Sequence, residues 1–180
     1  MMQLILTVLA IALAALLAVG GINYFSTDIG VRVEVAQGLR AQHDIMTAAL
    51  TNYRLANNGY IPTSVDSLTG FFPDGKVPTF PKTPDAFTWS ISKDSAGSRY
   101  WLCLRAGSVI PSRVAREGVA SFVRDRAAKS LGPIYYGENK SGFGVHGCGL
   151  DATAVAADAA GTTFDADDIS ANTMISIEGI

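Results

Sequence analysis

The first 27 residues contain no charged side chain, and most of them are apolar. The run from Leu4 to Phe25 has 22 residues. As an α-helix it would be about 33 Å long, which matches the hydrocarbon core of a bilayer. It also lacks the polar stripe of a helix on the surface of a globular domain. We therefore expect residues 1–27 to form a transmembrane anchor.

The same segment lacks the basic n-region with which a secretory signal peptide begins, because Met1 to Gln3 carry no charged side chain. We therefore expect the anchor to be retained. A cleaved signal peptide, with Ala15 or Ala18 near the cut, is the alternative. The first basic residue, Arg32, lies beyond the segment, so the charge distribution does not predict the orientation in the membrane.

Basic residues are absent from residues 150–180, which contain six acidic ones. The first 149 residues hold all 14 Lys and Arg against 10 acidic residues, and the net charge of the chain is −2. This balance argues against direct binding of nucleic acid. We predict an extracytoplasmic α+β domain over 28–149 and an acidic C-terminal segment over 150–180, where the alternating run Met174 to Ile180 could add an edge strand.

The chain has no recognisable catalytic motif, since G-x-S-x-G, P-loop, H-E-x-x-H and paired-carboxylate patterns are missing. His43, between Gln42 and Asp44, is interpreted as a solvated helix residue. The acidic run of Asp165, Asp167 and Asp168 lacks the glycine and distal glutamate of a calcium loop, so we interpret it as solvated too. We therefore predict no catalytic residue, no cofactor and no metal.

Two cysteines are too few to define a framework of disulfides. Cys103 falls on an expected strand and Cys148 near the end of the domain, and outside the cytoplasm a bond between them is favoured. It would close a loop of about 46 residues and contribute about 4 kcal/mol. Two separate buried thiols are one alternative. A metal site that also includes His146 is another, but it lacks an evident fourth ligand.

An amphipathic helix follows the apolar segment and is expected to end near Asn57. Asn58 and Gly59 can adopt the left-handed conformation that caps a helix, and Pro62 prevents the helix from resuming. Its apolar face repeats at steps of three or four residues. The positions on this face are Val31, Val35, Leu39, Gln42, Met46, Ala49 and Tyr53. We expect the face to be covered by the domain that follows or by a partner protein.

Residues 61–84 contain five of the seven prolines, which leaves room for one helical turn near Ser64 to Leu68. Phe71, Phe72 and Phe80 should attach this loop to the core. Alternating apolar residues then predict a β-hairpin, with Phe87, Trp89 and Ile91 in its first strand facing the helix and a second strand from Tyr100 to Arg105.

A second helix is expected from Pro111 and Ser112 to about Leu131. Its basic residues are Arg113, Arg116, Arg124 and Lys129. We interpret them as a solvated face, with binding of anionic lipid, of a partner's acids or of the chain's own acidic segment as alternatives. A second short hairpin is predicted from the runs at 134–136 and 143–145.

The junction after the first helix resembles a known pattern. Tyr53, Asn58, Gly59, Tyr60 and Pro62 form the Tyr…Asn-Gly-x-x-Pro run of the type IV pilin superfamily. Over about residues 1–145 the chain is more similar to the PilM family of type IVb thin and conjugative pili. The resemblance implies an α+β fold in which a transmembrane helix continues into a long amphipathic helix packed on a small antiparallel sheet, with a second helix.

The same resemblance implies a membrane-anchored structural or assembly component of a type IV pilus machine. It would lie in the bacterial inner membrane with a periplasmic domain, and it would contact pilin or pilus-machine subunits and membrane lipid. We expect the helix face and the junction to carry the function. The side chains of this face, directed at a partner or at the core, are Val35, Leu39, Met46 and Tyr53, and the junction residues are Asn58, Gly59, Tyr60 and Pro62. Ile5 stands where a mature pilin has the glutamate that pairs with a neighbouring subunit, which favours an assembly protein over a major pilin.

Other classes of protein stay open. A minor pilin or pseudopilin would enter the extracellular filament, and a homo-oligomer is compatible with either role. An unrelated bitopic protein with a periplasmic binding domain accounts for every feature except the junction. A membrane-tethered hydrolase accounts only for the anchor, and it would require a cleft lined by adjacent titratable groups.

Overall fold

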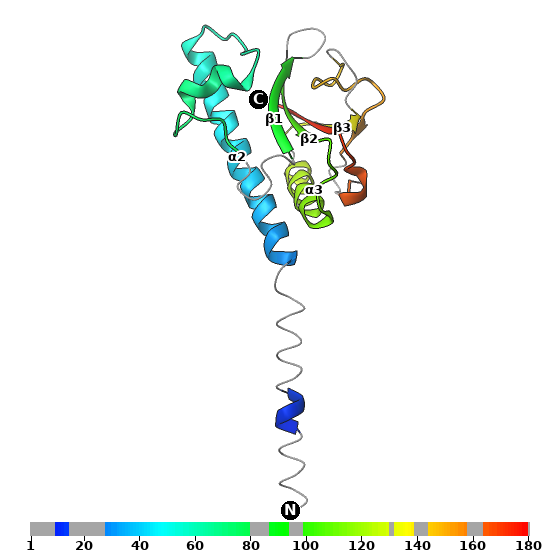
Figure 1. The fold of residues 1–180 in the computed structure, drawn as a ribbon. Helices are drawn as coiled ribbons and strands as arrows, with labels where there is room; N and C mark the ends of the chain where they lie inside the picture. Colours follow the sequence, from blue (N-terminus) through cyan, green and yellow to red (C-terminus); the bar gives the residue numbers. More distant parts are fainter. Residues whose placement is uncertain are drawn as a thin grey trace, which may run out of the picture.

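The structure is a computed structural model that describes residues 10–14, 28–79, 87–93, 99–129, 132–138, 144–157 and 164–179. These residues form a mixed α+β fold with a five-stranded sheet, which confirms the α+β part of the predicted fold (Figure 1). The expected membrane-spanning run from Leu4 to Phe25 lies outside the described residues except for 10–14, which are helical. Among the described residues, no helix is both long enough and apolar enough to span a membrane.

The longest element is the helix α2, Asp28–Ala56, which ends where the sequence predicts. Asn58 and Gly59 adopt positive φ angles of 53° and 82°, and the Gly59 N–H donates to the Arg54 carbonyl over 2.8 Å. This left-handed pair caps the last turn, because it turns the chain back onto carbonyls that the helix leaves unpaired. After the cap, Tyr60 is exposed and Pro62 is buried.

The sheet is antiparallel throughout and has the strand order β1-β2-β5-β3-β4. Its strands are β1 (Phe87–Lys93), β2 (Tyr100–Ala106), β3 (Ile134–Glu138), β4 (Val155–Ala156) and β5 (Thr173–Glu178). β1 and β2 pair as the predicted hairpin, with Trp89 opposite Leu104.

Two predictions about the sheet are wrong. The run that begins at Met174 forms β5, but β5 lies between β2 and β3 and not at an edge; both Cys103 and Tyr135 pair with Ser176. Five consecutive residues of β5 are buried, as in a strand covered on both faces. The predicted second hairpin is also absent, because β3 pairs with β4 and β5, and the described residues 144–145 are not a strand.

The remaining predicted elements are found close to their expected bounds. The helix α3, Arg113–Ala128, begins where the Ser112 hydroxyl accepts a hydrogen bond from the Ala115 N–H. The proline-rich loop contains the 3₁₀ helix η1, Val65–Phe71. Phe72 is buried and the Phe71 ring lies edge-on to Tyr53, so both attach the loop to the core; Phe80 lies outside the described residues.

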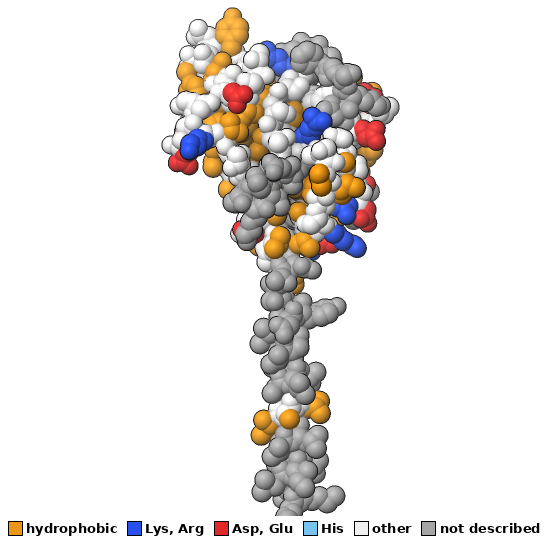
Figure 2. Space-filling model, viewed as in Figure 1, with side chains coloured by type: hydrophobic (Ala, Val, Ile, Leu, Met, Phe, Trp, Pro, Cys, Tyr) orange, Lys and Arg blue, Asp and Glu red, His pale blue; other side chains and the backbone are white. Residues whose placement is uncertain are grey.

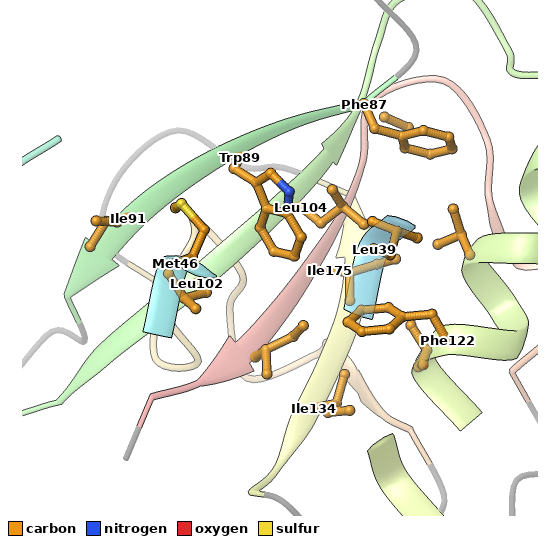
Figure 3. Close-up of a cluster of buried hydrophobic side chains, with 14 of the residues drawn as sticks. Leu39, Met46, Phe87, Trp89, Ile91, Leu102, Leu104, Phe122, Ile134 and Ile175 are labelled. Carbon is orange, nitrogen blue, oxygen red and sulfur yellow. The ribbon is translucent and has the colours of Figure 1, made fainter. Parts of the chain in front are cut away.

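The core lies between α2, α3 and one face of the sheet. Leu39 and Met46 are completely buried, and Val35 is 8% exposed. They meet Phe87, Trp89, Ile91, Leu102, Leu104 and Ile175 from the sheet and Phe122 from α3 (Figure 3). Tyr53 is half-buried at the edge of this cluster. The sheet and α3 therefore cover the apolar face of α2, and a partner protein is not needed for this.

Truncation of Leu39 should be costly. Leu39→Ala leaves a cavity between α2, the sheet and α3, and we expect the free energy of unfolding to fall by about 2 to 5 kcal/mol. Val33→Ala, on the exposed side of the same helix, should change it by less than about 0.5 kcal/mol. Denaturant unfolding of the full-length protein in detergent measures both. Equal effects of the two substitutions would contradict the placement of this face in the core.

Candidate functional site

The two helices approach each other closely at a glycine. A Cβ atom added at Gly118 of α3 would lie 2.7 Å from the Val35 Cβ and 3.0 Å from the Arg32 carbonyl oxygen, so any larger residue would push the helices apart. Further along, Arg126 of α3 meets His43 of α2. The residue numbers increase together along both helices, so α2 and α3 run parallel.

His43 lies in this helix interface, and the prediction that it is solvated is wrong. Its side chain is buried, with the residue 4% exposed. Nη1 of Arg126 donates to Nδ1 of His43 over 3.1 Å, and the rings of Trp89 and Phe122 lie 6.2 and 6.1 Å from the imidazole. The residue was misplaced because His43 does not belong to the apolar repeat, yet α3 also covers the side of α2 on which it lies.

A second polar contact joins α2 to the sheet. Nε1 of Trp89 donates to Oε1 of Gln42 over 2.8 Å, and Nε2 of Gln42 donates to the Thr79 carbonyl over 2.8 Å. A buried amide with both of its polar groups paired ties helix, strand and loop together. We call Gln42, His43, Trp89 and Arg126 the polar seam. The one sequence signal for it was a glutamine within an otherwise apolar face.

The electrostatics of the polar seam keep His43 neutral. Burial of the ring and then the positive charge of Arg126 lower the pKa of His43 to about 4, against a smaller opposing effect of Asp44, whose Oδ1 lies 3.7 Å away. Because Nδ1 accepts from Arg126, the single proton of the neutral ring belongs on Nε2. Burial also lowers the pKa of Arg126, but a guanidinium remains charged at neutral pH. The polar seam thus helps to hold α2, α3 and the sheet together around a buried cation, Arg126.

The other face of the sheet carries the predicted disulfide. Cys103 of β2 is bonded to Cys148, which confirms the pairing expected from the sequence. Trp101, Leu150 and Met174 complete a small second cluster around the bond. In this oxidised state neither sulfur can act as a thiolate ligand, so the alternative of a metal site with His146 is wrong.

His146 instead stacks on Tyr135, with ring centroids 3.8 Å apart. The acidic run forms the 3₁₀ helix η2, Ala166–Asp168, which is capped by Asp165. In the parts of the chain that the structure describes, no three His, Cys, Asp or Glu side chains are grouped closely enough to hold a metal ion.

The basic residues of α3 have different partners. Nη1 of Arg116 donates to the Ala166 carbonyl over 2.8 Å, so the chain's own C-terminal segment occupies this residue, one of the alternatives left open above. Arg113 lies 3.4 Å from Glu117 and Lys129 lies 3.0 Å from Asp125, both as exposed pairs one helical turn apart. Such exposed pairs contribute little to stability, which leaves Arg113 free to exchange its partner.

These features define a class of protein: an α+β domain built on one long N-terminal helix, with its interior polar groups engaged in packing. Comparison with known proteins does not identify a family within this class. No family model, no curated protein and no solved structure matches the chain. The function must therefore be inferred from the arrangement of the chain itself.

The depressed pKa of His43 predicts how stability depends on pH. An unfolded chain has a histidine pKa near 6.5, so below that pH the unfolded state binds a proton that the folded state excludes until about pH 4. The contribution of His43 is therefore full above pH 6.5 and is lost as the pH falls. We expect the wild type to lose about 2 kcal/mol more than His43→Gln between pH 7.5 and pH 5. If the wild type and His43→Gln lost the same free energy of unfolding between the two pH values, a buried neutral imidazole would be excluded.

Reduction of the disulfide should destabilise the domain without changing its helices. The bonded cysteines are 45 residues apart, and the chain-entropy argument assigns about 4 kcal/mol to a loop of that size. Denaturant unfolding with and without dithiothreitol measures the loss. A double variant, Cys103→Ala with Cys148→Ala, should not respond to the reductant, and a wild type equally unresponsive would contradict the bond.

Proposed function

We propose that this protein is a membrane-anchored structural component of a type IV pilus machine of the type IVb or conjugative kind. The observation that carries the proposal is the position of α2. It follows directly on the charge-free segment, its apolar face is the centre of the domain core, and its first turns project beyond the sheet (Figure 1). A helix that leads from a membrane-length apolar run into a sheet is the arrangement that the resemblance to pilin-like proteins implies.

The proposal places the domain in the periplasm, attached to the bacterial inner membrane. The run from Leu4 to Phe25 is long enough to span a bilayer, and the first charged residue, Asp28, begins α2. A disulfide persists in an oxidising compartment, and the bond between Cys103 and Cys148 favours the periplasm over the cytoplasm.

The function on this proposal is mechanical: the anchor holds one end, and α2 carries the domain to its partner subunits. Since the core covers Val35, Leu39 and Met46, partners must contact exposed parts of the chain. The exposed apolar side chains of α2 and the junction are Ile29, Val33, Leu55 and Tyr60. Ile29 and Val33, near the start of the helix, also favour a second candidate, a minor pilin that packs in the filament through this region.

Replacement of the anchor tests the proposal in the host bacterium. A strain without the gene is complemented with the wild type, with a variant in which a cleavable signal peptide replaces residues 4–25, and with a variant in which an unrelated membrane-spanning helix of equal length replaces them. We expect pili with the first and third proteins and none with the second. Immunoblots must show equal protein levels and an oxidised Cys103–Cys148 pair.

Each other outcome has a definite meaning. Normal pili with the released domain would show that the anchor is dispensable and would overturn the proposal. Loss of pili with the unrelated helix, together with recovery of the wild type in sheared filaments, would replace it with the minor-pilin candidate. Pili in the uncomplemented deletion strain would exclude both.

A further inference from the structure

Because α2 and α3 run parallel, α3 begins at the end of the domain where the proposed anchor joins α2. Val35 lies beside Gly118 and His43 beside Arg126, which is the same offset of 83 residues at two levels of the interface. With a rise of about 1.5 Å per residue in both helices, Arg113 is level with Gly30. The loop that precedes α3, residues 107–112, therefore joins α3 at the level of the first turn of α2.

This loop exposes two adjacent apolar side chains. Val109 is 79% exposed and Ile110 is 59% exposed, among the highest values for large apolar residues in the described chain. The loop is held on both sides: the Gly107 carbonyl accepts from the Asn172 N–H over 3.1 Å, and Pro111 is buried. Figure 2 shows hydrophobic side chains, with basic ones beside them, at the lower end of the domain.

The charged groups nearby are balanced. Arg32, Arg113 and Arg124 line a hollow of about 230 Å³ between the two helices and η2. Its acidic side chains are Glu117, Asp165 and Asp167. The side chain of Arg113 is 73% exposed and directly follows the apolar loop, so it can leave its exposed partner Glu117 and extend along the loop toward a phosphate.

We propose that the loop of residues 107–111 is a second membrane contact. Val109 and Ile110 enter the interface of the same bilayer that holds the anchor, and Arg113 contacts lipid phosphates. The inference rests on the anchor of the proposed function, because the anchor keeps the loop near the lipid and so reduces the entropic cost of the contact. A bilayer is the favoured occupant because the loop joins α3 within about one helical turn of the level at which the apolar run ends, where the lipid interface would lie.

The contact would have a mechanical consequence. A single transmembrane helix leaves the attached domain free to tilt and rotate over the membrane. Insertion of a loop beside that helix adds a second point of attachment. The domain would then tilt and rotate less, so the opposite end of α2, with Leu55 and the following Tyr60, would keep one orientation over the membrane. Burial of two apolar side chains in the interface is favourable but reversible.

Fluorescence quenching in vesicles tests the contact. The full-length Ile110→Trp variant is reconstituted in vesicles of phosphatidylethanolamine and phosphatidylglycerol, with and without phosphatidylcholine brominated in its acyl chains. Trp89 and Trp101 are buried in the domain, so the wild type supplies the background. We expect the fluorescence added by the new tryptophan to fall about twofold or more with brominated lipid, as for a side chain at the acyl boundary.

Leu55→Trp is the matched control. Leu55 is 79% exposed and lies about 39 Å along α2 from Ile29, so brominated lipid should leave its added fluorescence unchanged. Both variants must float with the vesicles and retain the Cys103–Cys148 bond. A chain that does not float contradicts the anchor, and with it the loop contact. A chain that floats but shows equal quenching at residues 110 and 55 contradicts the loop contact alone and leaves the anchor intact.

Discussion

The close packing of α2 against α3 is the contact on which the rest of the structure depends. Gly118 allows the helix backbones to meet beside Val35, and the buried Arg126 finds an acceptor in His43 two turns further on. Together the helices cover one face of the sheet, so that Leu39, Met46 and Phe122 become a common core. A larger residue at position 118 would push the two helices apart, and loss of the His43 acceptor would remove the partner of a buried charge at position 126.

The other face of the sheet is completed by segments from the C-terminal part of the chain. β5 fills the central position between β2 and β3, and the disulfide fastens residue 148 to β2. The sheet is incomplete until residues 173–178 are in place, so the domain is dominated by long-range pairing, which slows folding. For a protein proposed to fold in the periplasm, oxidation of the two cysteines would shorten that search.

The parallel direction of the two helices connects the fold to the proposed role. Because both helices begin at the same end of the domain, the start of α3 and the loop before it lie beside the start of α2. An anchor that precedes α2 therefore brings the exposed Val109 and Ile110 toward the lipid. An antiparallel arrangement would have placed this apolar pair at the far end of the domain, close to Tyr60.

The sequence by itself determined the elements whose signals are local: the cap of α2 at Asn58 and Gly59, the β1–β2 hairpin, and α3 with its cap at Ser112. It also favoured the bond between Cys103 and Cys148, because a disulfide persists in a domain outside the cytoplasm. It did not predict the burial of His43 or the central place of β5. The apolar repeat of α2 does not show that α3 covers the side on which His43 lies. The alternation from Met174 predicts a strand but not its neighbours, which are distant in the chain. Only the tertiary structure decided these, because Arg126 and β3 come from segments outside any local pattern.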